Sequence, residues 1–438
     1  MTAPENMTEP ASGGRPPKDP PGVDSPAGEP PGTPPEAVMS RAAGLTRLAA
    51  MSAFLIVGIS YASFLIRVPS LKVEHDLSAG QLGLLLVVPS VSALVAMQLA
   101  GGLVARYGSA PIARVTGVAL PLSLVGLALA SDPIQLAVAL VIFGLIDGLL
   151  DVSMNAHAIA VERAHKRSVM NRCHAAWSIG AMIASVLGGL AIQAGLTPMS
   201  HFLWLGVAVA LFSLVTGMWM LPASADRHAP QEGEKKVRVK WRDGWTPRVL
   251  MFGAMGAVIL ILEGAVGNWS GVFLLEDRGA TLAVASLGYT FFNLCQTAGR
   301  LVGDRLHERY GAPALVRVSG GIALCGLLMV VLSPGIVVAI AGFAVVGIGL
   351  SVLLPLIFSA VGHGGAEGLG AAAALARFTT LTYSGLLLGP VLVGWFAEFV
   401  GLAVTFAGLL VLLALVVLNA RSTGTADRAD RKEPAREA

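Results

Sequence analysis

The chain of 438 residues is 55% hydrophobic and only 13% charged, with a formal net charge of +3. Soluble proteins carry roughly 25% charged residues, so this composition excludes an ordinary soluble fold, and its apolar content excludes a disordered or collagen-like chain. The basic residues form no single face for nucleic acid, and the three cysteines have no metal-ligand spacing and imply no disulfide framework. We therefore expect an integral membrane protein that needs no cofactor or metal and binds no nucleic acid.

The chain is polar at both ends. Residues 1–44 form the first polar region, and 11 of the 25 prolines lie within its first 36 positions. Such a segment buries too little apolar area to offset the entropy of ordering it, so we predict a disordered tail. It is not a signal peptide, because no short basic region leads into an apolar core, and the first apolar helix should act as an uncleaved anchor. Residues 421–438 are expected to form a second tail.

Twelve apolar stretches lie between these tails. A helix needs about 20 mostly apolar residues to cross the hydrocarbon layer of a membrane, and turn residues and charges divide the chain into segments of that length. The predicted spans are 45–66, 81–104, 111–130, 134–158, 174–196, 201–221, 248–274, 281–303, 312–333, 335–358, 370–395 and 401–420. They make two six-span groups, 45–221 and 248–420, joined by a charged linker at 222–247.

Lysine and arginine residues predict how the spans are oriented, because these residues accumulate in cytoplasmic loops. With the N-terminus inside, most of the 30 basic residues fall on the cytoplasmic side. Only Arg67, Lys72 and Arg278 fall outside, and Arg377 lies within a span. We therefore predict a multi-pass protein of the plasma or inner membrane with both termini in the cytoplasm.

The two halves repeat a short loop sequence. RYGSAP at 106–111 is echoed by RYGAP at 309–313, with an offset of 203 residues. Both copies follow the second span of a six-span group. Two such halves are typical of secondary transporters, in which the solute binds between the halves near the middle of the membrane.

The loop after the second span resembles the signature loop of the major facilitator superfamily, in which a glycine is followed by three residues, Asp, a basic residue, any residue and glycine. Gly101, Arg106 and Gly108 match this pattern, whereas Ala105 stands in the Asp position. The matching residues of the second copy, which keeps an acid, are Asp304, Arg305, Arg309 and Gly311. The resemblance implies a gating role for both loops. In the family the loop acid helps to hold the outward-facing state, so Ala105 leaves that latch incomplete.

Four further stretches resemble the branch of the superfamily that contains MosC-like proteins. They are RVP at 67–69, DVSMNAH at 151–157, HAAWSIG at 174–180 and EGAVGNWS at 263–270. The resemblance implies an all-α, polytopic major-facilitator fold with twelve transmembrane helices in two pseudo-symmetric six-helix bundles. It also suggests a link to inositol-derived solutes.

Acidic side chains within the spans are the main candidates for binding a solute or protons. A charge at the centre of the bilayer costs about 2.5–3.5 kcal/mol on insertion, so such residues usually face a cavity or a partner. Asp147, Asp151 and Asn155 are four residues apart and share one helical face. Two ionised acids at this spacing repel each other, which favours uptake of a proton; pairing with cytoplasmic arginines is the alternative. Glu263 lies in the span that the resemblance places across the central cavity from Asp147.

Other polar residues within the spans are further candidates. Asn268 lies about one turn beyond the acid of its span. Asn293 and Gln296 could bind a solute or link helices to each other. Tyr61 offers a hydroxyl group, and Arg377 could neutralise a carboxylate or an anionic solute, or extend to the membrane interface.

These residues predict a carrier, not an enzyme, that moves a small solute by alternating access and uses the proton gradient. Uniport, export of cationic amphiphiles and a non-transporting sensor with the same fold are the alternatives. A membrane enzyme would need a catalytic cluster on a sizeable loop, and the linker has none. ATP is not expected to drive transport, because no GxxxxGK[ST] loop occurs. The expected partners are the solute, protons and the lipid bilayer, and we expect a monomer.

Overall fold

The computed structural model describes residues 36–165, 169–223, 245–362 and 369–425. The chain divides into two units, Met1–Arg41 and Ala42–Ala438, and the second holds every helix except the start of the first one. In chain order the helices are α1 (Glu36–Glu74), α2 (Ala79–Tyr107), α3 (Ser109–Leu129), α4 (Pro133–His165), α5 (Met170–Gln193), α6 (Pro198–Gly217), α7 (Pro247–Glu276), α8 (Leu282–Tyr310), α9 (Ala312–Val331), α10 (Ile336–Leu350), α11 (Leu353–Gly362), α12 (Leu369–Leu418) and the 3₁₀ helix η2 (Asn419–Thr425). No strand occurs among the described residues.

The twelve predicted spans map onto these helices once two breaks are considered. α12 contains Gly401, whose φ of 80° and ψ of 162° are not helical, so it comprises two successive helices. α10 and α11 together form one apolar stretch, Ile336–Val361, with a short break between them. The described residues include ten helices that are long and apolar enough to cross a membrane. One of these is α12, which comprises two successive helices. The predicted all-α polytopic architecture is confirmed.

The first helix begins earlier than the sequence suggested. We expected residues up to 44 to belong to the disordered tail, but α1 starts at Glu36. The segment EAVMSRAAGL contains mostly residues that favour a helix, including alanine, leucine, methionine and arginine, so the helix can extend beyond its apolar part. The rest of that tail, most of the predicted linker and the end of the C-terminal tail lie outside the described residues.

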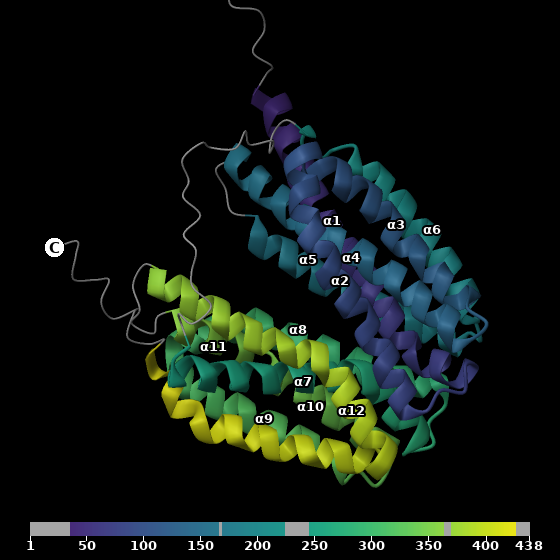
Figure 1. Cartoon of the computed structure of the whole chain (residues 1–438), viewed down its shortest axis with the longest axis vertical. Coiled ribbons are helices and arrows are strands. Elements are labelled where there is room, and N and C mark those ends of the chain that lie inside the picture. Colours follow the sequence, from purple (N-terminus) through teal and green to yellow (C-terminus); the bar gives the residue numbers. More distant parts are fainter. Residues whose placement is uncertain (1–35, 166–168, 224–244, 363–368, 426–438) are drawn as a thin grey trace, which may run out of the picture. The chain divides into compact units, whose positions relative to one another are not determined.

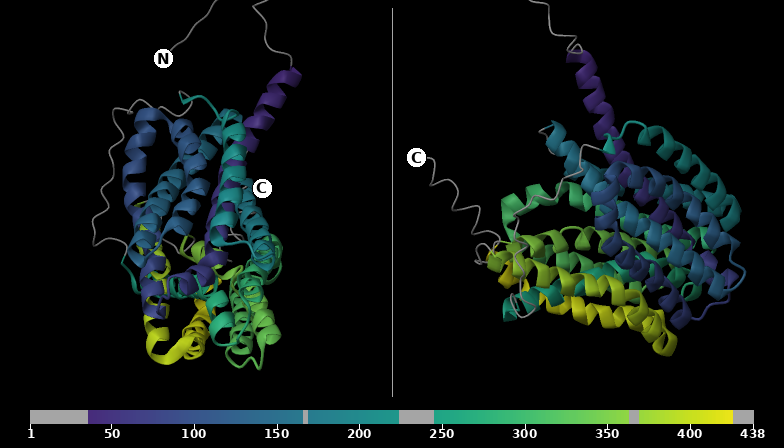
Figure 2. Two further views of the ribbon diagram at one scale, coloured as in Figure 1. Left: turned by 90° about the vertical axis from the view of Figure 1, so that its right-hand side faces the viewer. Right: turned by 45° about the horizontal axis from the view of Figure 1, so that its top comes forward.

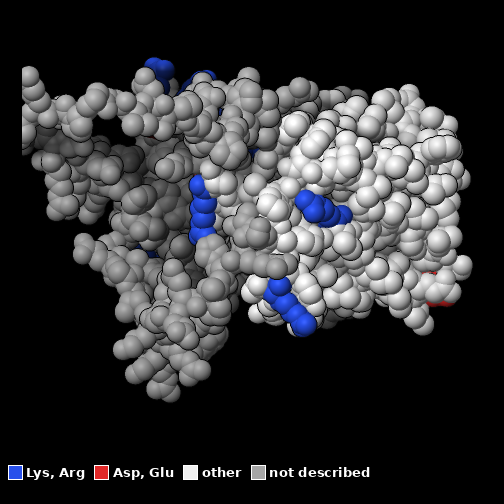
Figure 3. All heavy atoms as spheres, turned by 90° about the horizontal axis from the view of Figure 1, so that it is seen from above, with Lys and Arg blue, Asp and Glu red and all other residues white. Residues whose placement is uncertain are grey.

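The helices form two bundles, α1 to α6 and α7 to α12 (Figures 1 and 2). Within them, α2 packs on α4, α3 on α6, α7 on α12 and α9 on α10. Glycines allow some of these backbones to approach closely. A Cβ atom at Gly144 or Gly148 of α4 would lie 2.2 or 2.3 Å from the carbonyl oxygens of Pro89 or Ala93 of α2, so no other residue fits there. Most of the described surface seen in Figure 3 is uncharged, as expected for a protein surrounded by lipid.

The repeated loop has the same conformation in both halves. Gly108 follows α2 with a φ of 84°, and Gly311 follows α8 with a φ of 76°. In both copies the glycine N–H donates to the carbonyl four residues earlier, and the arginine lies over the neighbouring tyrosine ring, with Arg106 at 5.1 Å and Arg309 at 5.3 Å from the ring centroid. Glycine adopts a positive φ without the steric strain of other residues. The RYG sequence is therefore the turn that joins the second and third helices of each bundle.

The contacts between the bundles lie toward one end of the helices. We call this the far end, and we call the opposite end, where α6 ends and α7 begins, the linker end. At the far end Lys72 of α1 forms an ion pair with Glu276 of α7. Glu398 of α12 accepts a hydrogen bond of 2.8 Å from the backbone N–H of Gly80, at the start of α2.

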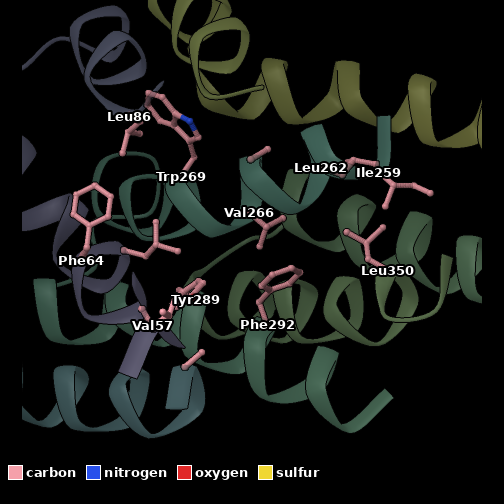
Figure 4. Packing of buried hydrophobic residues seen from close by; sticks show 14 of the residues in the cluster. Val57, Phe64, Leu86, Ile259, Leu262, Val266, Trp269, Tyr289, Phe292 and Leu350 are labelled. Atoms are coloured by element: carbon pink, nitrogen blue, oxygen red, sulfur yellow. The ribbon is translucent and has the colours of Figure 1, made fainter. Parts of the chain in front are cut away.

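Close backbone packing reinforces these polar contacts at the far end. A Cβ atom at Gly83 of α2 would lie 2.8 Å from the carbonyl oxygen of Pro390 and 3.1 Å from the Cα atom of Gly394, both in α12. Trp269 of α7 is fully buried and lies next to Leu86 of α2 (Figure 4). The far end is therefore closed by both backbone and side-chain contacts.

We expect Gly83→Ala to destabilise the far-end-closed conformation by about 1–3 kcal/mol, the usual effect of overpacking. Spin labels on the exposed residues Ser131 and Val337 at the far ends of the two bundles would report a longer distance. Gly102→Ala in the same helix is the matched control, because its new methyl group meets no atom within 4 Å. Equal distance distributions in the two variants would contradict this interpretation of the packing.

We expect the fraction of molecules with a closed far end to fall from wild type to Glu398→Gln to Glu398→Lys. The carboxylate lies at the positive end of the α2 dipole, glutamine keeps an acceptor without the charge, and lysine places a cation there. The same pair of spin labels measures this order. A lysine variant as closed as wild type would show that this contact does not hold the bundles together.

Candidate functional site

A cavity of about 500 Å³ lies between the two bundles. It is lined by residues of α1, α2, α4 and α5 from the first bundle and of α7, α8 and α12 from the second. Its polar lining residues are Tyr61, Ser90, Asp147, Asp151, Glu263, Asn268, Tyr289, Asn293, Gln296 and Tyr383. The cavity thus brings together most of the residues that the sequence singled out.

A second space of about 990 Å³ adjoins this cavity, and we call it the vestibule. Asp151 and Trp177 line both spaces. The vestibule also contacts His174 near the start of α5, His307 near the end of α8 and Ser359 in α11, all of which lie toward the linker end. The central cavity therefore adjoins a space at the linker end, while the far end is closed.

The acids of α4 face the cavity. The Oδ1 atom of Asp147 is buried and has no hydrogen-bond partner. Asp151 accepts a long hydrogen bond of 3.4 Å from the side chain of Asn155, which also donates to the Asp151 backbone carbonyl at 2.8 Å. The two ion pairs found among the described residues involve neither acid. The predicted shared face of Asp147 and Asp151 thus opens onto the cavity, whereas Asn155 supports Asp151 without lining it.

Glu263 faces the cavity from α7 and has a basic neighbour on the next helix. Its Oε1 atom lies 3.6 Å from the Nη2 atom of Arg300 in α8 and has no hydrogen-bond partner. The side chains are 18% and 36% exposed, respectively. Sequence reasoning missed Arg300, because we considered only basic residues on the same helix as the acid. Its position inside the predicted 281–303 span was a usable signal, since a charge there needs a partner or water.

Three amide side chains also line the cavity. Asn293 and Gln296 are each 5% exposed, and their amide nitrogen atoms are buried without hydrogen-bond partners. Asn268 donates to the Gly264 carbonyl in its own helix at 2.8 Å. Asn293 and Gln296 therefore offer donors to a ligand, whereas one of the two N–H donors of Asn268 is already used.

Tyrosine rings contribute much of the remaining lining. Three of the five tyrosines in the chain, Tyr61, Tyr289 and Tyr383, face the cavity. Tyr61 packs against the rings of Phe64 and Phe143, each with a centroid separation of 6.2 Å. We predicted Tyr61 but missed the other two, although tyrosine is rare in this chain and its other two copies belong to the RYG turns.

Arg377 lies away from the cavity. It is 9% exposed, and its guanidinium group lies 5.5 Å from the ring centroid of Trp245, just before the start of α7. This places it at the linker end, and it lines neither the cavity nor the vestibule. The structure therefore gives no support for the predicted contact of Arg377 with a solute.

The predicted gating residues also lie at the linker end. Gly101, Arg106 and Gly108 belong to the end of α2 and its turn. Ser109 lies at 3.3 Å, Oγ to Nδ1, from His157 of α4, which ties that turn to the helix that carries the acids. In the second copy, Arg305 and Arg309 are exposed and Gly311 forms the turn, and the side chain of Asp304 lies outside the described residues.

The described residues contain no group of three or more His, Cys, Asp or Glu side chains arranged to hold a metal ion. The cavity and the adjoining vestibule are lined by acids, amides, one arginine and aromatic rings. These groups can bind a polar solute and exchange protons.

Comparison with solved structures relates this arrangement to known transporters. The nucleoside transporter NupG matches with a TM-score of 0.69 at 13% identity, over 86% of this chain and 98% of that chain. A bacterial homolog of the human lysosomal transporter Spinster, in an inward-facing and unoccupied conformation, matches with a TM-score of 0.68 at 15% identity, over 90% and 99%. At such low identities these matches show a shared fold.

Comparison with curated sequences finds nearer relatives. An uncharacterized MFS-type transporter of Yersinia pestis is 32% identical over 373 residues, which cover 84% of this chain and 94% of that protein. Membrane protein MosC of Rhizobium meliloti is 29% identical over 390 residues, covering 89% and 92%. The resemblance seen in the sequence is thereby confirmed, including its MosC-like branch. Since residues 50–379 also match the family model, this chain belongs to the Major Facilitator Superfamily of membrane transporters.

Proposed function

We propose that the protein is a proton-coupled secondary transporter that carries a small polar solute by alternating access. The observation that carries this proposal is the cavity between the bundles, into which Asp147 and Glu263 present carboxyl oxygen atoms without hydrogen-bond partners. A buried carboxyl oxygen atom without a hydrogen-bond partner is costly in a membrane protein, so a proton or a ligand group would complete each site. Aromatic rings and free amide donors around the acids suit a polar organic solute.

The distribution of contacts supports alternating access. The far end is closed by an ion pair and by close backbone packing, whereas the linker end leads to the vestibule. With the orientation that the basic residues predict, the linker end is cytoplasmic, the protein lies in the inner membrane with both termini inside, and this conformation is open to the cytoplasm. A single chain contains both bundles and the whole cavity, so we propose that it works as a monomer.

The named structural relatives include carriers of polar solutes. Besides the nucleoside transporter, a D-xylose–proton symporter matches with a TM-score of 0.65 at 14% identity, over 87% of this chain and 97% of that chain. These names are compatible with a polar solute and with proton coupling in the same fold.

Coupling would follow from protonation of the acids. Binding of a proton to Asp147 or Glu263 removes the charge that disfavours a closed, dehydrated cavity, and so biases the equilibrium between the open states. A membrane potential of about 100 mV supplies roughly 2.3 kcal/mol per charge moved, which is enough to bias a two-state switch. Asp151, which lines both spaces, would pass protons between the cavity and the vestibule.

We expect Asp147→Asn and Glu263→Gln to abolish accumulation driven by a pH gradient while solute exchange without a gradient continues. Amide side chains keep the size and hydrogen bonding of the acids but bind no proton. The purified full chain is first screened by thermal shift against nucleosides, pentoses, polyols, amines and amino acids. The solutes that stabilise it are then followed in proteoliposomes with an imposed pH gradient, where each variant should lose at least about 10-fold in accumulation.

Asp76→Asn is the matched control for this experiment. Asp76 is an exposed acid at the far end with a φ of 48°, and asparagine tolerates that conformation well. This variant should accumulate solute as wild type does. Undiminished accumulation in both cavity variants would rule out these acids as the coupling sites. Transport by the wild-type protein that does not respond to the pH gradient would indicate a uniporter.

A further inference from the structure

One face of α8 carries a row of hydrogen-bond donors. Asn293, Gln296 and Arg300 are separated by three and four residues, so they lie on the same face of the helix. Asn293 and Gln296 line the central cavity, and Arg300 lines the vestibule. With a rise of about 1.5 Å per residue, this row extends roughly 10 Å along the helix. It therefore follows the route from the cavity toward the linker end.

The donors of this row are largely unused. The amide nitrogen atoms of Asn293 and Gln296 are buried without partners, and an unsatisfied buried donor costs about 1–3 kcal/mol. Arg300 approaches Glu263 only to 3.6 Å, which is longer than a hydrogen bond. Its guanidinium group therefore retains donors that face the vestibule.

Arg300 is also the one strongly basic side chain of the route. Among the described residues that line the cavity or the vestibule, no lysine and no other arginine occurs. A guanidinium group presents parallel N–H donors that match both oxygen atoms of a carboxylate. Its single long contact with Glu263 leaves this geometry unfilled.

The opposite wall has the opposite polarity. On α4, Asp147 presents acceptors to the cavity and Asp151 presents acceptors to both the cavity and the vestibule. When all are ionised, these two acids and Glu263 outweigh Arg300, so a simple anion is repelled from the cavity. A solute with a cationic donor group at one end and an acid at the other would satisfy both walls.

We propose that Arg300 binds the carboxylate of a small zwitterionic solute in place of Glu263, while Asp147 and Asp151 receive its ammonium group. This inference rests on the proposed transport function and specifies the solute class for the same cavity. The carboxylate of Glu263 lies 3.6 Å from the guanidinium group of Arg300. The carboxylate of the solute displaces it from this position. Asn293 and Gln296 donate to further acceptors along α8.

The test compares acids with amides of the same size. Amino acids from glycine to aminohexanoate are the zwitterionic probes, and the corresponding amino-amides keep the ammonium group but lack the carboxylate. Binding is measured by thermal shift on the full chain and flux in proteoliposomes. Wild type should prefer at least one amino acid over its amide. Arg300→Gln should weaken the binding of that amino acid about 10- to 100-fold and leave the binding of the corresponding amide unchanged.

Further variants separate binding from folding. Arg300→Lys keeps the positive charge but loses the parallel N–H donors of the guanidinium group. It should therefore retain part of the preference for the amino acid over its amide. Glu263→Gln frees Arg300 and should strengthen amino-acid binding, which provides an independent result if Arg300→Gln does not fold. Arg317→Gln is the matched control, because Arg317 is exposed on α9 and lines neither space.

Two outcomes would overturn the inference. One is equal binding of amino acids and their amides by wild type; the other is an acid preference that survives in Arg300→Gln. In both cases, flux of polyols or amines in proteoliposomes would still support the proposed transport function. Specific binding of an amino acid that depends on Arg300, without flux of any probe, would instead contradict the transport function and support a sensor.

Discussion

The hydrocarbon layer offers no hydrogen-bond partner, and this constraint governs the placement of every charge in the molecule. Two arginines near the ends of helices, Arg67 and Arg114, are satisfied within the protein. Arg67 donates to His201 at 3.1 Å and to the Leu196 carbonyl at 2.8 Å, and Arg114 donates to the Gly217 carbonyl at the end of α6 at 2.7 Å. Two of the cavity acids differ, since Asp147 and Glu263 each have a buried oxygen atom without a hydrogen-bond partner. These structural charges are satisfied internally, whereas Asp147 and Glu263 each keep a carboxyl oxygen atom open to a ligand or a proton.

The packing supports our proposal that the two bundles move as units. Within a bundle, glycines bring helix backbones into direct contact, as between α4 and α2, and such interfaces resist sliding because they are close-packed. Between the bundles, the far end combines this kind of packing with exposed polar contacts of Lys72 and Glu398. Exposed polar contacts contribute little free energy and exchange readily with water. They can hold one arrangement of the bundles without preventing the other.

The sequence predicted features that depend on local properties. Apolar length predicted the spans, the repeated RYG sequence marked the loop after the second span of each half, and four-residue spacing placed Asp147 and Asp151 on one face. Features that depend on the packing of distant helices were missed. The pairing of Glu263 with Arg300 and the cavity positions of Tyr289 and Tyr383 follow from how α7, α8 and α12 meet. Residue spacing within one helix does not predict which other helices it contacts. An arginine inside a predicted span does indicate that the arginine has a partner.

In the part of the chain that the structure describes, the ion pair and the carboxylate contact that join the two bundles lie at the far end. Among the described residues, the ion pair that joins the two bundles is at the far end, whereas the ion pair of Glu263 lies within the second bundle. At the linker end, the family motif would supply an acid beside Arg106, but the side chain there is the methyl group of Ala105. A methyl group cannot accept a hydrogen bond or balance a cation. Among the described residues, the electrostatic contacts between the bundles are at the far end, and the vestibule lies at the linker end.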